Sequence, residues 1–333
     1  HMGEFEMMKK TTSALAIAAL LGTGAASAAT MQINDDTTLS IGGDFQMVYN
    51  STTGSDGEES TGFGDNGTSL VFSGEHVADN GLTTFFNLDL DGFDTTEAGS
   101  RFQGAADTDP GEDVDEAHVG ISGSFGHVKV GSDVGAFDKY ADYADVDQNI
   151  GLTSISTGDA DDLIEYGNTV GNVEFLLQAE VGTQDEGSTA DNGSTTSLGA
   201  GFSADLGGVT LTGAYDQRAN TATDEPIYGV GVSTNIGGAD LTLGYETDDQ
   251  ENSIDLVTLA GSYSVGQTTF VGALQSTSYD SVPEGETDDS FTELYAGIIY
   301  NVTSQMYVYG EMITKDREND AGDNLAVGVY YGW

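Results

Sequence analysis

The feature that most constrains the fold of this chain is a period-two alternation of apolar and polar residues. In the segment Thr38–Tyr49, TLSIGGDFQMVY, Leu, Ile, Phe, Met and Tyr occupy odd positions, while Thr, Ser, Asp and Gln occupy even positions. Successive side chains of a β-strand point to opposite faces, so this alternation predicts a strand with one apolar and one polar face.

Comparable runs recur to the end of the chain, joined alternately by short glycine-containing turns and by long acidic segments. Glycine supplies the positive φ that tight hairpins need. The expected strands number sixteen: Thr38–Tyr49, Ser69–His76, Leu82–Asp91, Asp115–Gly123, His127–Ser132, Leu163–Asn168, Val173–Val181, Thr195–Asp205, Val209–Asp216, Ile227–Asn235, Asp240–Thr247, Ile254–Ser264, Thr268–Thr277, Phe291–Tyr300, Gln305–Thr314 and Leu325–Trp333. This organisation predicts an all-β fold, a 16-stranded antiparallel transmembrane β-barrel with short periplasmic turns and long extracellular loops.

The first residues are not expected to belong to the barrel. His1–Glu6 looks like a remnant of an expression vector. Residues 7–28 have the organisation of a secretory signal peptide, with a positive segment (Lys9, Lys10), a short apolar segment (Ala14–Leu21) and a small-x-small cleavage motif (Ala26-Ser27-Ala28). We therefore expect the barrel domain to comprise residues 29–333. No later segment is long and apolar enough to cross a bilayer as a helix, and a closed barrel is the remaining way to pair every backbone group in lipid.

The charge is extreme: 56 acidic and 8 basic residues give a net charge of −48. Such a surface repels the phosphate backbone, so no nucleic-acid partner is expected. The acidity fits a pore that concentrates cations, and it also fits adaptation to high salt in a halophilic bacterium. The chain has no cysteine, which excludes disulfides and cysteine-based zinc sites.

The polar faces of the expected strands carry many carboxylates: Asp44, Glu75, Asp89, Glu116, Glu165, Glu180, Asp216 and Glu246. A barrel of sixteen strands is too wide for side chains to fill, so such a lining can stay hydrated. A non-conducting acidic barrel, or a secreted β protein with an adhesive or structural role, is the alternative interpretation.

Catalysis and cofactors are not expected. No nucleotide-binding motif is present, and His118 and Ser122 would lie about 13 Å apart along one strand, too far for a catalytic hydrogen bond. The acidic run Asp107–Glu116 could attract calcium but lacks the spacing of an EF-hand loop. We therefore predict no enzyme activity, no cofactor and no specific metal site.

Four segments together resemble the trimeric general porins of Gram-negative bacteria. Ser69–Asp91 and Glu116–Ser132 resemble the second and third hairpins, the latter with its Gly-x-Phe-Gly turn. Asp133–Asp161 stands where these porins fold their third loop back into the channel. The tail Ala326–Trp333, AVGVYYGW, resembles the C-terminal strand with its terminal aromatic residue.

The resemblance implies a homotrimer in the outer membrane, in contact with lipid and lipopolysaccharide, through which ions and small hydrophilic solutes diffuse passively. It also implies an inward-folded third loop that forms the constriction. The terminal Trp333 would be recognised by the barrel assembly machinery.

The sequence departs from the family pattern in its basic residues. Gly131-Ser132 replaces the usual Gly-Arg, and Glu165-Tyr166 replaces an arginine before tyrosine. We therefore predict cation selectivity. The expected constriction residues are Asp138, Asp142, Asp145 and Asp147, and the expected wall residues are Glu75, Glu116, Glu165 and one positive group, Lys129.

Two alternatives concern the same loop. Most of its aspartates could simply be solvated loop residues. Phe137, Tyr140 and Tyr143 could stack against sugars, although packing of the loop against the wall is the favoured interpretation.

Overall fold

The computed structural model describes residues 29–54, 56–91, 114–156, 158–181, 196–217, 226–248, 253–282, 289–317 and 321–333. The predicted vector remnant and signal peptide, and most of the acidic run 107–116, lie outside these residues. The described chain is almost entirely β-strand: β1 (Ala29–Asn34), β2 (Thr37–Thr53), β3 (Glu59–Asp65), β4 (Leu70–Val77), β5 (Thr83–Leu90), β6 (Glu116–Gly123), β7 (Gly126–Val134), β8 (Asp159–Val170), β9 (Val173–Val181), β10 (Thr196–Asp205), β11 (Val209–Gln217), β12 (Ile227–Ile236), β13 (Ala239–Asp248), β14 (Ile254–Val265), β15 (Thr268–Tyr279), β16 (Ser290–Asn301), β17 (Met306–Lys315) and β18 (Asn324–Gly332).

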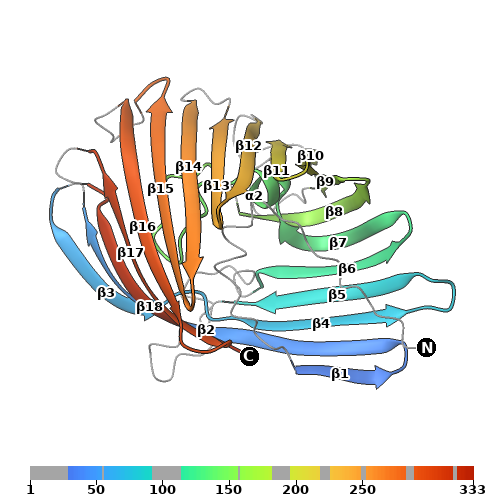
Figure 1. Ribbon diagram of the computed structural model, residues 1–333. Coiled ribbons are helices and arrows are strands. Elements are labelled where there is room, and N and C mark those ends of the chain that lie inside the picture. Colours follow the sequence, from blue (N-terminus) through green and yellow to red (C-terminus); the bar gives the residue numbers. More distant parts are fainter. Residues whose placement is uncertain are drawn as a thin grey trace, which may run out of the picture.

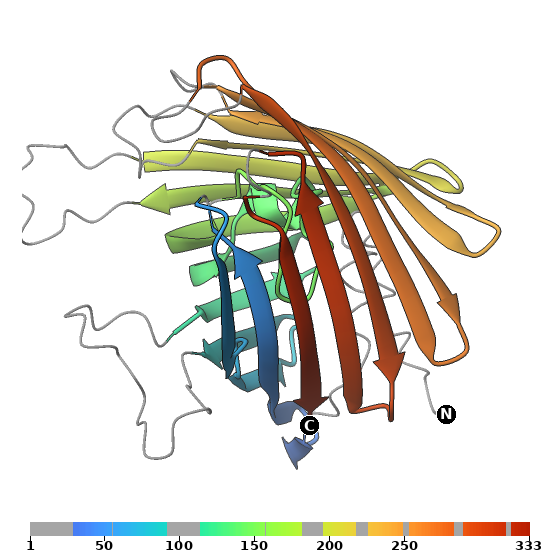
Figure 2. The same cartoon turned by 90° about the vertical axis from the view of Figure 1, so that its left-hand side faces the viewer.

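The strands close into a ring in chain order (Figure 1). β2 pairs with β4, each later strand pairs with the next, and β18 returns to β2 in antiparallel register, Asn324 opposite Thr52 and Gly332 opposite Asp44. Figure 2 shows this closure, with β18 beside β2. The ring has sixteen strand positions, as the sequence predicts.

Two short strands were not predicted. β2 is long enough to have different neighbours along its length. Its first half pairs with β1 and β4, and its second half with β18 and β3. β1 therefore continues the line of β18, and β3 continues the line of β4, so neither adds a position to the ring.

The two faces of the wall have the reverse of a soluble protein's polarity. In β14, Val257 and Leu259 are 46% and 49% exposed, whereas Thr258 between them is fully buried. The neighbouring strand repeats this arrangement, with Leu274 exposed and Gln275 buried. An apolar outer face and a polar inner face are expected of a barrel whose outside contacts lipid.

Tyrosines mark both ends of the outer apolar band. Tyr215, Tyr228 and Tyr245 are exposed on strands β11–β13, close to the rim where the long connections lie. Tyr263, Tyr300 and Tyr331 are exposed near the rim of short turns. Two such girdles are typical of the boundaries between lipid and water. No helix in the described part of the chain is long and apolar enough to cross a membrane.

Candidate pore constriction

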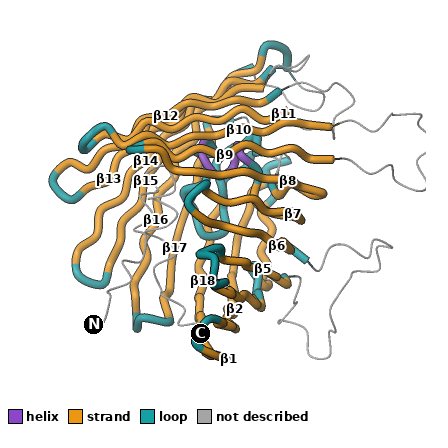
Figure 3. The backbone as a smooth tube through the Cα atoms, turned by 90° about the vertical axis from the view of Figure 1, so that its right-hand side faces the viewer, coloured by secondary structure: helices purple, strands orange, loops and turns teal. Residues whose placement is uncertain are grey.

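The connection between β7 and β8 turns into the barrel. It contains the short helix α2 (Ala136–Tyr140), which lies inside the ring of strands (Figures 1 and 3). We call residues 135–158 loop 3. The inward-folded third loop predicted from the sequence is therefore present.

The first half of loop 3 packs by shape against the inner wall. Phe137, Tyr140 and Tyr143 are buried, and they form an apolar cluster with Leu176 of β9 and Ile227 of β12. These side chains pack on the wall, as the favoured interpretation of the aromatic residues predicted.

Glycines make room for two of these rings. A β-carbon at Gly201 would collide with the ring of Tyr140, and a β-carbon at Gly231 or Gly244 would collide with the ring of Tyr143. Tyr143 also bonds through its hydroxyl to Thr212 Oγ1 at 2.9 Å. The aromatic rings of loop 3 therefore fit positions on β10, β12 and β13 that have no side chain.

The second half of loop 3 crosses to another part of the wall. Val146, Ile150 and Leu152 are buried in a cluster with side chains of β14–β18, and also with Val48 of β2. Tyr295 and Ile313 are among the wall residues of this cluster.

Buried glutamates of the wall accept hydrogen bonds from the loop's main chain. Glu311 accepts the N–H groups of Gln148 at 3.0 Å and Ile150 at 3.1 Å. Glu293 accepts from Thr153, through its N–H at 3.2 Å and its hydroxyl at 3.1 Å. Because an irregular segment has main-chain donors without strand partners, these acceptors satisfy groups that would otherwise be costly to bury.

The predicted constriction aspartates all lie on loop 3. Asp145 is exposed, and Asp138, Asp142 and Asp147 are half-buried. Asp142 accepts hydrogen bonds from the Ala144 N–H at 3.1 Å and the Ser154 hydroxyl at 3.3 Å.

Loop 3 lies beside the membrane-spanning strands, and its surroundings perturb these carboxyls. Burial, followed by the charges of Asp145 and Asp138, raises the pKa of Asp142 to about 7. Burial, followed by the charges of Glu311 and Asp145, raises the pKa of Asp147 to about 7. Asp145 meets solvent, although the surrounding protein still raises its pKa.

The predicted wall residues share the inner face of β4–β8. Strand register places Glu75 opposite Phe85, Gly120 opposite Lys129, and Lys129 opposite Glu165. Directly opposite residues share a face, and the buried Lys129 and Glu165 identify that face as the inner one. Glu75 is exposed there and Glu116 is half-buried.

Lys129 is neutralised by carboxylates. Its ammonium contacts Asp133, and it lies 3.3 Å from Glu165 Oε2. Glu165 is fully buried and also bonds to His127 Nε2 at 2.7 Å. Glu165 is therefore a buried partner of Lys129 and His127 and not an exposed charge.

A second wall cation has the same arrangement. Lys315 Nζ lies 2.6 Å from Glu293 Oε1, and the Arg317 guanidinium lies 4.5 Å from the centre of the Phe291 ring. Lys139 belongs to α2, and the other two basic residues of the barrel domain, Arg101 and Arg218, lie outside the described residues. Both described wall lysines are thus paired with buried glutamates.

This combination of a closed sixteen-position barrel, an apolar exterior and an inward loop agrees with comparisons to known proteins. A family model described as Gram-negative porin matches residues 11–320. The chain belongs to the Gram-negative porin family. This porin is therefore a channel protein of the bacterial outer membrane.

Two curated relatives come from bacteria of the genus Halomonas. A monosaccharide porin of a Halomonas species and the major outer membrane protein of Halomonas elongata are each 27% identical to this porin. Each match spans 372 aligned residues, 97% of this chain and 100% of the relative.

Solved structures share the fold at low sequence identity. The anion-selective porin from Comamonas acidovorans matches with a TM-score of 0.71 and 16% identity, over 90% of this chain and 100% of that one. OmpT of Vibrio cholerae in its trimer form matches with a TM-score of 0.65 and 15% identity, over 90% and 100% of the two chains.

Trp333 ends the chain beside β2. Its main-chain N–H bonds to the Gly43 carbonyl at 3.0 Å, and its ring lies 5.0 Å from that of Phe45. Its role as an assembly signal stays a prediction.

The sequence analysis did not single out Glu293, Glu311 or the inner-face glycines. The signal for the glutamates was their position on the polar face of a predicted strand. Nothing in the local sequence, however, indicates that loop 3 would reach them.

Proposed function

We propose that this porin is a cation-selective diffusion channel whose constriction is formed by loop 3. The observation that carries the proposal is a difference in pairing. The two described wall lysines are matched by buried glutamates, whereas Asp145 is exposed and its neighbours on the loop are half-buried. Carboxylates at a narrow point attract cations, and low-dielectric walls focus their field.

Within this proposal, Asp138, Asp142, Asp145 and Asp147 supply the field of the constriction. Glu75 and Glu116 extend it along the wall of β4 and β6. Glu165 contributes by neutralising Lys129, and so removes the positive wall charge that would oppose the loop. No catalytic step is part of the proposal.

The assembled protein is proposed to be a homotrimer surrounded by outer-membrane lipid and lipopolysaccharide, inserted by the barrel assembly machinery through Trp333. The trimer form of one fold neighbour supports the oligomeric state. The net charge of −48 and the two Halomonas relatives support a halophilic origin, since salt screens repulsion among so many carboxylates.

Uncharged monosaccharides are a second class of solute that we propose. One relative is named a monosaccharide porin. On the inner face of this porin, Tyr307 and Tyr330 stack with ring centres 4.6 Å apart and planes within 8°. Tyr307 is buried, so the half-buried Tyr330 ring is the aromatic face that we propose for a sugar, and block of ion conductance by glucose would reveal binding.

The proposal is tested by the reversal potential of the refolded protein in a planar bilayer with a tenfold KCl gradient. We expect current steps in groups of three and a cation-selective potential. Asp138→Asn combined with Asp142→Asn should reduce the selectivity. The matched control, Asp35→Asn with Asp79→Asn, removes two exposed charges from the short-turn rim and should leave selectivity unchanged.

Anion preference in the wild-type protein would refute the proposed selectivity. If the double variant of loop 3 had the same cation selectivity as the wild type, those two residues would not be part of the selectivity filter. A silent bilayer from folded protein would instead favour the non-conducting, structural or adhesive role.

A further inference from the structure

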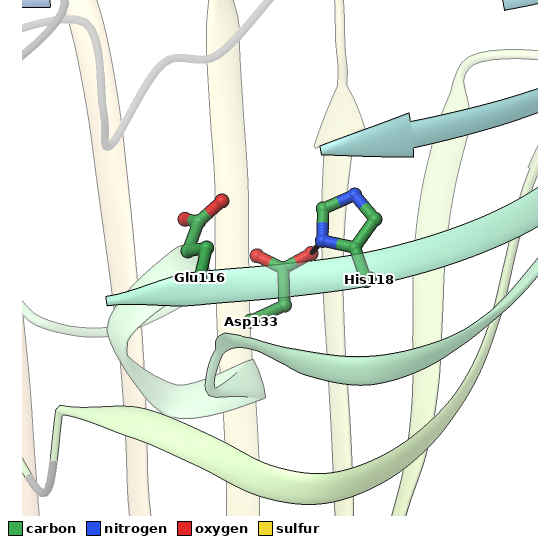
Figure 4. Close-up of side chains that lie close together, drawn as sticks. All are labelled: Glu116, His118 and Asp133. Carbon is green, nitrogen blue, oxygen red and sulfur yellow. Dashed lines mark ion pairs between the residues drawn. The ribbon is translucent and has the colours of Figure 1, made fainter. Parts of the chain in front are cut away.

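We propose that Glu116, His118 and Asp133 form a binding site for a divalent transition-metal ion such as Zn²⁺, on the inner wall at the base of loop 3. Their donor atoms all lie within 4.8 Å of one another. Figure 4 shows Asp133 between the other two, with the His118 ring directed toward it. The site shares Glu116 with the proposed cation-selective wall, but it is tested by metal binding and not by selectivity.

Strand pairing places the three residues together. Glu116 and His118 are two apart on β6, so they share a face, and Asp133 lies on the neighbouring β7 where the register shifts. His118 Nδ1 and Asp133 Oδ2 are 3.5 Å apart. Two ligands of a tetrahedral zinc ion, each about 2.1 Å from the metal, are separated by about 3.4 Å. This pair therefore already has the spacing that a shared metal requires.

The donor atoms are prepared for a cation. His118 Nδ1 is buried and has no hydrogen-bond partner among the described residues, so a neutral ring with its proton on Nε2 would present a lone pair there. Asp133 Oδ1 accepts the Val134 N–H at 2.7 Å, and Oδ2 faces both His118 Nδ1 at 3.5 Å and the Lys129 ammonium.

Surrounding groups hold the ligands in place. The Asn87 amide donates to Glu116 Oε2 at 3.0 Å, and the Phe85 ring packs edge-on against the His118 ring at 6.1 Å. Such outer contacts fix ligand orientation in known metal sites.

The ligand set selects the class of ion. One imidazole with two carboxylates suits Zn²⁺, Co²⁺ or Ni²⁺, whereas Mg²⁺ and Ca²⁺ prefer oxygen donors alone. Three protein ligands leave a further position for water or chloride from the lumen, as in open zinc sites.

Lys129 is the cation that competes for this position. Its ammonium contacts Asp133, and Glu165 lies on its other side at 3.3 Å. A bound metal would take over Asp133, while Lys129 would keep Glu165 as its partner. Replacing Lys129 should therefore strengthen metal binding, which is the opposite of what loss of a ligand would do.

The position of Asp133 links the site to the channel. Asp133 is two residues before Gly135, where loop 3 begins. A metal bound to both β6 and Asp133 would fix the point from which the constriction loop departs.

The test is a calorimetric titration of the folded, chelator-treated protein with Zn²⁺. The titration is done in 1 M NaCl with excess Mg²⁺. Under these conditions the Debye length is about 3 Å, and Mg²⁺ occupies the many carboxylate-only positions. His1 is replaced by glutamine in every protein. We expect one strong site per protomer, with affinity lower by at least about tenfold in His118→Gln and in Glu116→Gln.

Two variants complete the design. His76→Gln is the matched control, because His76 lies on β4 with its Nδ1 bonded to Thr37, and it should bind zinc like the wild type. Lys129→Met should bind several-fold more tightly. Co²⁺ loaded into the wild type should show the intense visible bands of a four-coordinate site, a readout that requires no substitution.

The proposal would be overturned if, in excess Mg²⁺, the wild type bound Zn²⁺ no more tightly than its scattered carboxylates do. Equal zinc affinity in wild type and His118→Gln would also overturn it. If that variant does not fold, Glu116→Gln and the cobalt spectrum decide, and a spectrum like that of aqueous Co²⁺ would count against the site.

Discussion

The two halves of loop 3 are attached to the same wall by different means. The first half, residues 136–144, places aromatic rings over glycines of β10, β12 and β13. The second half, residues 145–153, adds main-chain hydrogen bonds to two buried glutamates of β16 and β17. The first half also donates the Tyr143 N–H to the buried Glu246 of β13 at 3.3 Å and the Tyr140 hydroxyl to Glu174 of β9 at 2.9 Å. The first attachment therefore combines the shape of the wall with its charge, whereas the second donates three main-chain N–H groups to two wall glutamates.

The difference shows how a loop can be fixed inside a wet barrel without using its own charges. Wall carboxylates accept the backbone N–H groups of Gln148, Ile150 and Thr153, so most of the loop's aspartates are not needed as anchors. The aromatic rings fit where the wall has no side chain, and their hydroxyls bond to Glu174 and Thr212. Both arrangements leave the acidic side chains of the loop available to act on ions.

The largest effect is expected from the charged attachment. Glu311→Ala would remove the acceptor of the Gln148 and Ile150 N–H groups and of the Tyr295 hydroxyl. Each buried donor left without an acceptor costs about 1–3 kcal/mol. We expect a lower unfolding temperature and a larger, fluctuating single-channel conductance, because the second half of the loop leaves the wall.

Glu311→Gln is the control for this prediction. The amide keeps one carbonyl oxygen as an acceptor, so its conductance should lie between those of Glu311→Ala and the wild type. If Glu311→Ala gave the steady conductance of the wild type, the apolar contacts alone would hold the second half of the loop, and the contrast between the two halves would fail.

A smaller effect is expected from the attachment by shape. Gly244→Ala would place a methyl group in the space of the Tyr143 ring. Overpacking of this kind costs about 1–3 kcal/mol, and the first half of the loop must move. The measurements are the unfolding temperature and the single-channel conductance.

The same substitution on the outer face of the wall, which loop 3 does not touch, is the control. At Gly272 of β15 the nearest atom to a new methyl group is the Tyr295 carbonyl oxygen at 3.8 Å, so Gly272→Ala should be silent. Adding Tyr143→Ala to Gly244→Ala removes the ring that the new methyl group displaces, so the single-channel conductance should return part of the way to the wild-type value. Equal effects of the two alanines would show that Tyr143 does not depend on the glycine.

The sequence predicted the ring and the packing of the loop's aromatic residues on the wall, but not the glycines and glutamates that receive the loop. Alternation and glycine turns predicted sixteen strand positions, because both signals are local. β1 and β3 were missed because each is short and merely extends the line of another strand. The need for glycine at position 244 comes from Tyr143, which lies 101 residues earlier, and only the folded loop brings the two together.

The same limit applies to charge. The sequence predicted acidic residues on loop 3 and on the wall, and the structure places both sets on the inside. It could not distinguish Asp145, which is exposed, from Glu165, which is buried against Lys129 and His127. Exposure and pairing depend on contacts between strands, which alternation does not encode.

A change of pH is expected to have the smallest effect on the structure but a clear effect on the reversal potential. One aspartate of each half of loop 3 is involved, Asp142 in the first half and Asp147 in the second. The pKa values of Asp142 and Asp147 are raised to about 7 from an ordinary value of 3.8, chiefly by burial. As the pH falls from 8 to 6, both carboxyls take up protons, so loop 3 loses negative charge. The reversal potential should therefore show weaker cation selectivity at pH 6 than at pH 8.

The stability of the fold should respond in the opposite direction. Because the folded protein binds these two protons more tightly than the unfolded chain, protonation favours folding. The contribution of the pair to stability is thus present at low pH and declines as the pH rises through about 7. Asp142→Asn and Asp147→Asn should each remove part of both trends, and the double variant should remove most of them. If only one single variant flattened the selectivity profile, the field at the constriction would come from one half of the loop, and the two attachments would differ in function as well as in chemistry.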